Sequence, residues 1–273
     1  MLRIIRERLR QRFRTISFPR GAPPALPARF RGLPRIDQSR FVHGVDEVIA
    51  SCPTGALSRD AKGALTLDLG RCIFCGECAR MAPQGAITFT SDYRLAVRTR
   101  EHLVLSEGEL RHAVELGGKL RRQLGRSLKL RQVSAGGCNG CEADANVLTT
   151  IGWDMGRFGI QFVASPRHAD GLLVTGPVTR NMLLALRKTY EAVPAPKIVI
   201  ASGACAISGG LYRGFAETCN GVTELLPVDL FVPGCPPHPL TLLDGLLRLI
   251  GRIGEKDPLP SITPSGEETT REL

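Results

Sequence analysis

The chain has 273 residues, of which 43% are hydrophobic, and its sequence contains no apolar run as long as the roughly 18 to 20 residues that span a membrane. This length suits one large domain or two smaller domains, each with its own core. Residues 1–36 hold ten arginines and one acid, whereas the rest of the chain holds 26 basic and 25 acidic groups, which argues against a nucleic-acid-binding body.

Residues 1–36 form a basic N-terminal arm. Its first fourteen residues interleave apolar side chains with arginines, as in a helix that lies on an anionic membrane surface or docks beneath a membrane subunit. A solvated, disordered tail and a mitochondrial targeting peptide have similar compositions, so both remain alternatives. The stretch from Pro19 to Pro34 is rich in Pro, Gly and Arg and predicts an extended wrapping segment. Because the sequence shows no apolar signal-peptide core, we expect a cytoplasmic protein.

The chain contains nine cysteines, which call for metal or redox explanations before disulfides when no secretory signal is present. They fall into two groups. The first group is Cys52, Cys72, Cys75 and Cys78, and the second is Cys138, Cys141, Cys205, Cys219 and Cys235.

An internal repeat explains the first group. Residues 42–57 align with residues 72–87 at an offset of 30. The second copy has cysteines at three positions where the first copy has Val42, Val45 and Val48. Conversely, the first copy keeps Cys52 before a proline, where the second copy has Ala82.

The two copies resemble the C-x2-C-x2-C-x3-C-P run of bacterial ferredoxins, in which the fourth cysteine of one run ligates the cluster of the other run. By that crossing rule one ligand set is complete, and it consists of Cys52, Cys72, Cys75 and Cys78. The other set, Val42, Val45, Val48 and Ala82, has lost every ligand. We therefore predict that residues 37–92 form a ferredoxin-like domain with one [4Fe-4S] cluster and an erased second site filled by apolar side chains. A zinc knuckle remains the alternative.

This half also resembles the two-cluster ferredoxin-like subunit of respiratory complex I and its counterpart in energy-converting hydrogenases. The segment Pro27–Gly32, Pro-Ala-Arg-Phe-Arg-Gly, looks like the Arg-Phe-Arg-Gly segment before the cluster domain of those subunits. Those subunits carry two clusters, whereas one is expected here. Residues 93–127 then form a linker, in which Ser106 and Glu109 make a capping box and predict an amphipathic helix to about Leu124.

Residues 128–253 show a different sequence pattern, in which short apolar runs alternate with helical stretches such as Arg180–Glu191. The runs are Leu128–Val133, Gly171–Val174, Lys197–Ala201 and Leu230–Val232. This alternation predicts an α/β fold with a doubly wound parallel sheet. The apolar stretch Leu240–Ile253 is interrupted by Asp244 and Arg248 and predicts an amphipathic helix. Residues 254–273 are polar and predict a disordered tail.

Three of these runs end in Gly- or Pro-rich loops that carry Cys138 and Cys141, Cys205, and Cys235. Since functional sites of parallel sheets lie beyond the carboxyl ends of the strands, these four thiols are expected to converge and to hold a second [4Fe-4S] cluster. Cys219 is left without a role. His238 is interpreted as a loop residue, because four thiolates suffice for a cluster.

This set resembles the proximal-cluster site of [NiFe]-hydrogenase small subunits and the homologous quinone-side subunit of complex I. The resemblance covers about residues 128–253, implies a flavodoxin-like sheet, and includes Trp153–Gly159, Thr175–Thr179 and the Pro-Gly-Cys-Pro-Pro run at Cys235. Complex I subunits place two cysteines side by side at the first site, whereas hydrogenase subunits use C-x-x-C, as Cys138 and Cys141 do here. Glu142 resembles the acidic residue that follows this motif in energy-converting hydrogenases, so a role in proton transfer and a solvated loop residue are both open.

The chain shows no nucleotide-binding fingerprint and no candidate catalytic triad, so we expect no catalytic residue and no complete active site on it. The resemblances imply an iron–sulfur electron-transfer subunit of a membrane-associated [NiFe]-hydrogenase or formate hydrogenlyase-like complex. Its two [4Fe-4S] clusters would relay electrons between a hydrogenase-type large subunit and a redox partner, on the inner face of the membrane and without nucleic acid. The alternatives are a complex I-type NADH-quinone oxidoreductase subunit, a stand-alone carrier, and a zinc-stabilised interaction protein.

Overall fold

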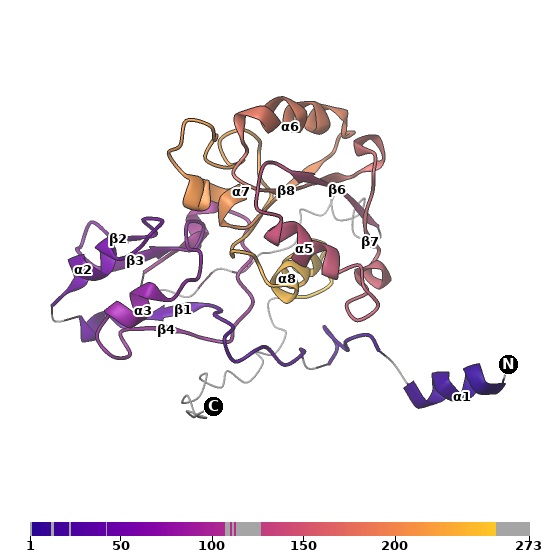
Figure 1. Cartoon of the computed structure of the whole chain (residues 1–273), viewed down its shortest axis with the longest axis horizontal. Coiled ribbons are helices and arrows are strands. Elements are labelled where there is room, and N and C mark those ends of the chain that lie inside the picture. Colours follow the sequence, from indigo (N-terminus) through magenta and orange to yellow (C-terminus); the bar gives the residue numbers. More distant parts are fainter. Residues whose placement is uncertain are drawn as a thin grey trace.

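The computed structural model describes residues 2–11, 14–21, 23–41, 43–106, 110, 112 and 127–254. A smaller module, residues 34–106, lies beside a larger one, residues 127–254, and the N-terminal arm runs past the larger module to reach the smaller one (Figure 1). We call these the first and second modules. No helix of the described residues is long and apolar enough to cross a membrane.

The first module consists of two similar strand–helix–strand halves. The elements are β1 (Pro34–Ile36), α2 (Val45–Ala50) and β2 (Leu57–Arg59), followed by β3 (Leu65–Asp68), α3 (Glu77–Met81) and β4 (Ile87–Phe89). The strands pair across the halves, because β1 is antiparallel to β4 and β2 is antiparallel to β3. Then η2 (Arg100–Leu103) leads to β5 (Val104–Leu105), which adds to β3. The repeat in the sequence is therefore a duplicated unit whose halves interlock.

Apolar side chains occupy the positions of the repeat at which cysteines are replaced. Val48 is 1% exposed and Ala82 is 9% exposed, and both belong to one apolar core against which Val45 packs. Val42 lies outside the described residues. Three of the four replaced positions thus contribute to packing.

The second module is built on a parallel sheet of five strands in the order β10-β9-β8-β6-β7. The strands are β6 (Leu128–Ser134), β7 (Ile160–Phe162), β8 (Gly171–Thr175), β9 (Ile198–Ser202) and β10 (Leu230–Val232). The four predicted strands are confirmed. The strand β7 was not predicted, because three residues with alternating burial give too short a signal.

Helices cover both faces of this sheet (Figure 1). α6 (Arg180–Ala192) lies on one face, and α5 (Gly140–Val147) and α8 (Pro239–Leu249) lie on the other. The short helix α7 (Ala204–Ser208) follows β9, and single 3-10 turns lie at η1 (Gln38–Arg40), η3 (Met155–Phe158), η4 (Pro166–His168) and η5 (Gly210–Tyr212). The mixed α/β class with a parallel sheet is as predicted.

The prediction that the α8 segment is amphipathic is wrong. Every residue of α8 is buried, including Asp244 and Arg248. Arg248 Nε donates to Asp244 Oδ2 at 2.8 Å and Nη2 donates to Oδ1 at 3.2 Å, so the two charges neutralise each other one turn apart. Paired in this way, both can lie in the core, where burial still raises the pKa of Asp244.

The arm begins with α1 (Leu2–Gln11), none of whose residues is buried. Its later residues contact both modules, as expected of a wrapping segment. Ile16 N donates to Gly152 O at 2.9 Å, and Gly32 N donates to Thr90 O at 2.8 Å. Arg157 donates to the carbonyls of Ile16 and Phe18, each at 2.7 Å. The predicted linker helix and the tail from residue 255 onward lie outside the described residues, apart from isolated positions before residue 113.

The buried pair in α8 leads to a stability prediction. Replacing Arg248 by Met leaves the Asp244 carboxylate in the core without its bonded partner, and we expect the free energy of unfolding to fall by roughly 3–5 kcal/mol. The double variant Asp244→Leu/Arg248→Met should recover most of that loss. Urea unfolding followed by circular dichroism measures both.

The matched control is Lys188→Met, which breaks the exposed pair with Glu191 and should cost no more than about 1 kcal/mol. A single Arg248→Met variant as stable as the control would show that Arg94, which also acts on Asp244, balances the carboxylate alone.

Candidate functional site

Four cysteines of the first module line one pocket, together with apolar side chains from β2, β3 and β4. Cys52 lies in the turn after α2, and the other three lie in the loop that becomes α3. Cys72 and Cys78 are buried, Cys52 is partly buried and Cys75 is exposed. The structure therefore brings together the four residues that the crossing rule selects: Cys52, Cys72, Cys75 and Cys78.

The loop around these thiols is tightly turned. Phe74 has φ +56° and Gly76 has φ +80°. A Cβ on Gly76 would lie 2.7 Å from Nε of Arg31, whose guanidinium also donates to the Phe74 carbonyl at 3.3 Å. Two backbone N–H groups point at sulfur, from Ala56 to Cys52 at 3.2 Å and from Phe74 to Cys72 at 3.3 Å. Such bonds favour a negatively charged sulfur.

Burial disfavours free thiolates at this site. It raises the pKa of Cys72 to about 12 and that of Cys78 to about 11, and the neighbouring thiols add to both shifts. At neutral pH these thiols stay protonated unless the positive charge of a bound metal compensates for burial.

The half of the repeat that holds only Cys52 has the same frame as the half that holds three cysteines. Asp37 pairs with Arg40 at 2.8 Å, and 31 residues later Asp68 pairs with Arg71 at 3.4 Å. Arg40 donates to the Gln84 carbonyl at 3.0 Å, and Arg71 donates to the Gly55 carbonyl at 3.4 Å. Each arginine thus ties its own half to the Pro-x-Gly turn of the other half.

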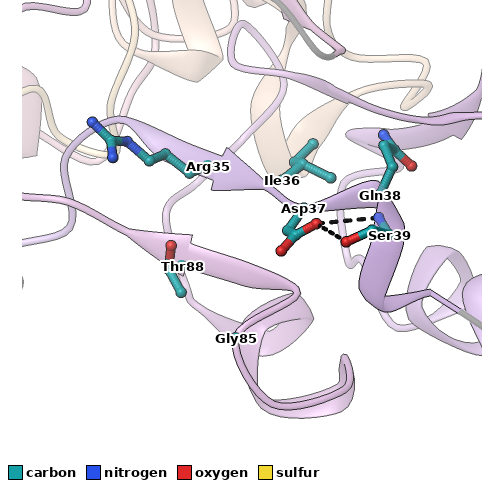
Figure 2. Close-up of a pocket in the computed structure, with 7 residues that line it drawn as sticks. All are labelled: Arg35, Ile36, Asp37, Gln38, Ser39, Gly85 and Thr88. Carbon is teal, nitrogen blue, oxygen red and sulfur yellow. Dashed lines mark hydrogen bonds between the residues drawn. The ribbon is translucent and has the colours of Figure 1, made fainter.

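Figure 2 shows the surface hollow beside the frame of the half that holds only Cys52, where the Asp37 carboxylate turns toward Ser39. The hollow measures about 450 Å³ and has no cysteine in its lining, which is Arg35, Ile36, Asp37, Gln38, Ser39, Gly85 and Thr88. Neither Asp-x-x-Arg frame was predicted from the sequence, because their offset is 31 residues whereas the cysteine runs align at 30.

The second group of thiols lies at the carboxyl ends of three strands of the parallel sheet. Cys138 and Cys141 follow β6, Cys205 follows β9 and Cys235 follows β10. Burial raises the pKa of Cys141, with Cys205, Cys235 and Cys138 adding to the shift, and it raises the pKa of Cys205 to about 11. These mutual effects require that the four thiols lie close together, as the sequence predicts.

One glycine is required by close approach at this site. Gly203 has φ +91°, and a Cβ there would lie 2.6 Å from the Cys141 sulfur. A side chain at this position would therefore push into the group of thiols.

Glu142 and His238 have structural contacts beside the second group. Glu142 is 5% exposed, and its Oε1 accepts from the hydroxyls of Ser134 at 2.6 Å and Thr175 at 2.7 Å, so the solvated-loop alternative is wrong. His238 caps α8 by accepting from Leu240 N at 3.1 Å, as expected for a loop residue. Cys219 packs against the apolar core.

The described residues contain no group of three or more His, Cys, Asp or Glu side chains set to hold a single metal ion.

The two modules meet between the two groups of thiols. The Ser208 hydroxyl of α7 donates to the Gly70 carbonyl at 2.8 Å, and Val97 forms a two-bond bridge with Phe231 of β10. A hollow of about 400 Å³ opens at this joint, lined by Pro53 and Thr54 from one module and Gly210, Leu211, Arg213, Gly214 and Asn220 from the other. The chain itself therefore fixes the two groups relative to each other.

Residues 138–249 match the family model described as NADH ubiquinone oxidoreductase, 20 Kd subunit. The probable membrane-bound hydrogenase subunit mbhJ of Pyrococcus furiosus is 42% identical over 137 residues, which cover 50% of this chain and 82% of that protein. The chain belongs to this 20 kDa-subunit family.

Two further relatives come from different complexes. Formate hydrogenlyase subunit 7 of Escherichia coli is 41% identical over 50% of this chain and 54% of its own length. A subunit of the NADH-quinone oxidoreductase of Geotalea daltonii is 50% identical over 38% of this chain and 60% of its own length. The chain thus spans little more than half of either protein. All three relatives are named as subunits of oxidoreductase complexes, and the expectation that this chain is such a subunit is confirmed.

The contacts of Glu142 lead to a second stability prediction. Glu142→Ala removes the acceptor of two hydroxyls, one of them on the fully buried Thr175, and should lower the free energy of unfolding by about 1–3 kcal/mol. Glu142→Gln keeps an acceptor oxygen and should cost less. Urea unfolding of both variants, with the exposed Glu217→Ala as control, tests the difference. Equal losses in the Ala and Gln variants would show that the charge, and not the acceptor oxygen, is what the two hydroxyls require.

Proposed function

We propose that this chain is the iron–sulfur electron-transfer subunit of a membrane-associated [NiFe]-hydrogenase or formate hydrogenlyase-like complex. One [4Fe-4S] cluster would be held by Cys52, Cys72, Cys75 and Cys78, and a second by Cys138, Cys141, Cys205 and Cys235. The observation that carries the proposal is that one chain holds two separate groups of four convergent thiols across a fixed joint.

The residues at both groups suit this cofactor. Buried thiols with raised pKa need a strongly positive partner before they ionise. Backbone N–H groups already point at Cys52 and Cys72, and Gly203 leaves the space beside Cys141 open. A [4Fe-4S] cluster in each place would supply uptake and release of single electrons at a potential set by burial and hydrogen bonds to sulfur.

The exposure of the cysteines suggests which faces meet other proteins. Cys75 is exposed on the first module, and Cys138 and Cys235 are exposed on the second. Electron transfer to a partner requires a short path, so the exposed cysteines mark where each partner docks. We assign the large catalytic subunit to the face of Cys138 and Cys235, and the redox partner to the face of Cys75.

The spacing of the first two cysteines of the second group favours the hydrogenase branch over a complex I-type NADH-quinone oxidoreductase subunit. Between Cys138 and Cys141, Asn139 turns the backbone at φ +70° and caps the start of α5. The two thiols therefore lie on either side of a turn, as the C-x-x-C pattern of hydrogenase small subunits implies. The relatives include both kinds of complex, so the identity of the large subunit decides between them.

Anaerobic iron and sulfide analysis, with EPR of the reduced protein, tests the cluster count. We expect about eight irons and two cubane signals in the wild type. Cys52→Ala should lose about half of the iron and one of the two signals, because Cys52 closes the group in the first module. Cys219→Ala is the matched control and should keep all of the iron.

Contrary results would separate the alternatives. About four irons in the wild type, or undiminished signals in Cys52→Ala, would exclude the crossed set of ligands in the first module. Zinc in place of iron would support the interaction-protein alternative.

The exposed helix α1 suggests how the subunit meets the membrane. Leu2, Ile5 and Leu9 share one face of the helix and are 84%, 52% and 73% exposed. Arg3, Arg6 and Arg10 form the adjoining basic stripe. We propose that this helix lies on the anionic inner face of the membrane, with its apolar face toward the acyl chains and its arginines at the headgroups.

Flotation with vesicles of phosphatidylcholine and phosphatidylserine tests this helix. Each arginine near the surface contributes about 1 kcal/mol, so a variant with Arg3, Arg6 and Arg10 changed to Gln should bind about 100-fold more weakly. The control variant changes the exposed Arg40, Arg59 and Arg80 to Gln, which removes the same charge from the first module. Equal loss of binding in both variants would exclude a specific role of α1.

A further inference from the structure

The joint between the modules lies only a few residues from a thiol on each side. Gly70, whose carbonyl accepts from the Ser208 hydroxyl, precedes Cys72 by two residues. Ser208 follows Cys205 by three residues at the end of α7. A Cβ on Gly70 would lie 2.9 Å from Ile207 and 2.8 Å from the guanidinium carbon of Arg100, so the contact is closely packed.

This joint concentrates positive charge. Arg100 binds the Asp68 carboxylate through two bonds of 2.8 and 2.6 Å, and Arg71 binds the same carboxylate at 3.4 Å. Arg213, on the loop after Cys205, adds a further cation that acts on Arg71. Within the described residues, the Arg213 guanidinium makes no hydrogen bond or ion pair. Arg100 and Arg71 therefore share one carboxylate, and Arg213 adds a third positive charge beside them.

Holding these cations together is unfavourable by itself. Burial, Arg213 and Arg100 all lower the pKa of Arg71, and its buried Nε lacks a hydrogen-bond partner with good geometry. Like charges in a partly buried region repel more strongly than they do in water. A nearby negative charge would relieve the repulsion, and Cys72 follows Arg71 directly in the chain.

The duplicated half provides an internal comparison. At the equivalent position Asp37 pairs with Arg40, and the carboxylate receives no second arginine within the described residues. Within the described residues, the second arginine thus occurs in the half that carries Cys72, Cys75 and Cys78 and is absent from the half that carries only Cys52. If the frame served folding alone, both halves would need the same charges.

We infer that Arg71 and Arg213 form a positive bridge between the two groups of thiols that raises the reduction potential of the cluster at each. The inference rests on the proposed function, because it assigns these residues a role toward the proposed clusters. Reduction adds one electron to a cluster already surrounded by four thiolates, and no bond breaks. A fixed cation nearby stabilises the more negative, reduced form by Coulomb attraction. Arg213 lines the hollow at the joint together with Pro53 and Thr54, which follow Cys52, and with Gly210, which closely approaches the Cys205 sulfur, so Arg213 should act on both sites.

Potentiometric titration of the holoprotein, followed by EPR with dithionite as reductant, tests the bridge. Arg213→Gln should move both midpoint potentials to more negative values, and Arg71→Gln should move the potential of the Cys72 cluster furthest. Arg213→Lys keeps the charge and should restore the wild-type potentials. Arg40→Gln, at the equivalent position of the other half of the repeat, is the matched control and should leave both potentials unchanged.

The outcomes separate this inference from the proposed function. Unchanged potentials in Arg213→Gln with full iron content would overturn the bridge and leave the clusters in place. Equal shifts in Arg40→Gln would overturn it as well, because the effect would then reflect net charge alone. A wild type without iron–sulfur signals would instead overturn the proposed function. Arg213 is exposed and makes no described bond, so Arg213→Gln should not disturb folding. This variant therefore tests the bridge even if Arg71→Gln fails to load iron.

Discussion

The constraint on which the rest of this structure depends is the convergence of thiols in two groups of four, some of them buried. A buried thiol resists ionisation, and here the pKa of Cys72 reaches about 12 and that of Cys205 about 11. Four thiols converge only if the backbone turns sharply around them. This explains the positive φ of Phe74 and Asn139, and it explains why position 203, whose backbone lies close to the Cys141 sulfur, is a glycine. The interlocked halves of the first module and the sheet of the second are two ways of supplying such turns from rigid elements.

Much of this arrangement could be predicted from the sequence, because cysteine spacing and apolar runs are local signals. The four strands predicted for the parallel sheet are confirmed, and the crossing rule selects four cysteines that share a pocket. Interactions between distant residues leave no such signal. The prediction for α8 is wrong, because Asp244 and Arg248 look like a polar face until their mutual bonds within the core are known. The Asp-x-x-Arg frames are hidden in the sequence, because one extra residue shifts them out of register with the cysteine repeat.

The comparison of the two halves shows how a duplicated unit can carry cysteines at different positions in its two copies and keep the same fold. Val48 and Ala82 are buried and pack in the apolar core, as a small apolar residue such as cysteine would at the same positions. Arg40 still ties its half to the turn at Gln84, as Arg71 ties the other half to the turn at Gly55. The fold of each half is therefore stabilised by the frame and the apolar core. It does not depend on which positions carry cysteine.

The fixed joint gives a reason for placing both modules on one chain. Separate subunits would have to form the contact between Ser208 and Gly70, and that between Val97 and Phe231, against the entropy of association. Within one chain the same contacts form between tethered partners, and the arm adds a further tie by binding the second module before it enters β1. A joint held in this way can keep three arginines close together, because the surrounding contacts balance their repulsion. The same rigidity keeps the loops of Cys72 and Cys205 in a constant relation, which is the condition that a relay between two redox sites requires.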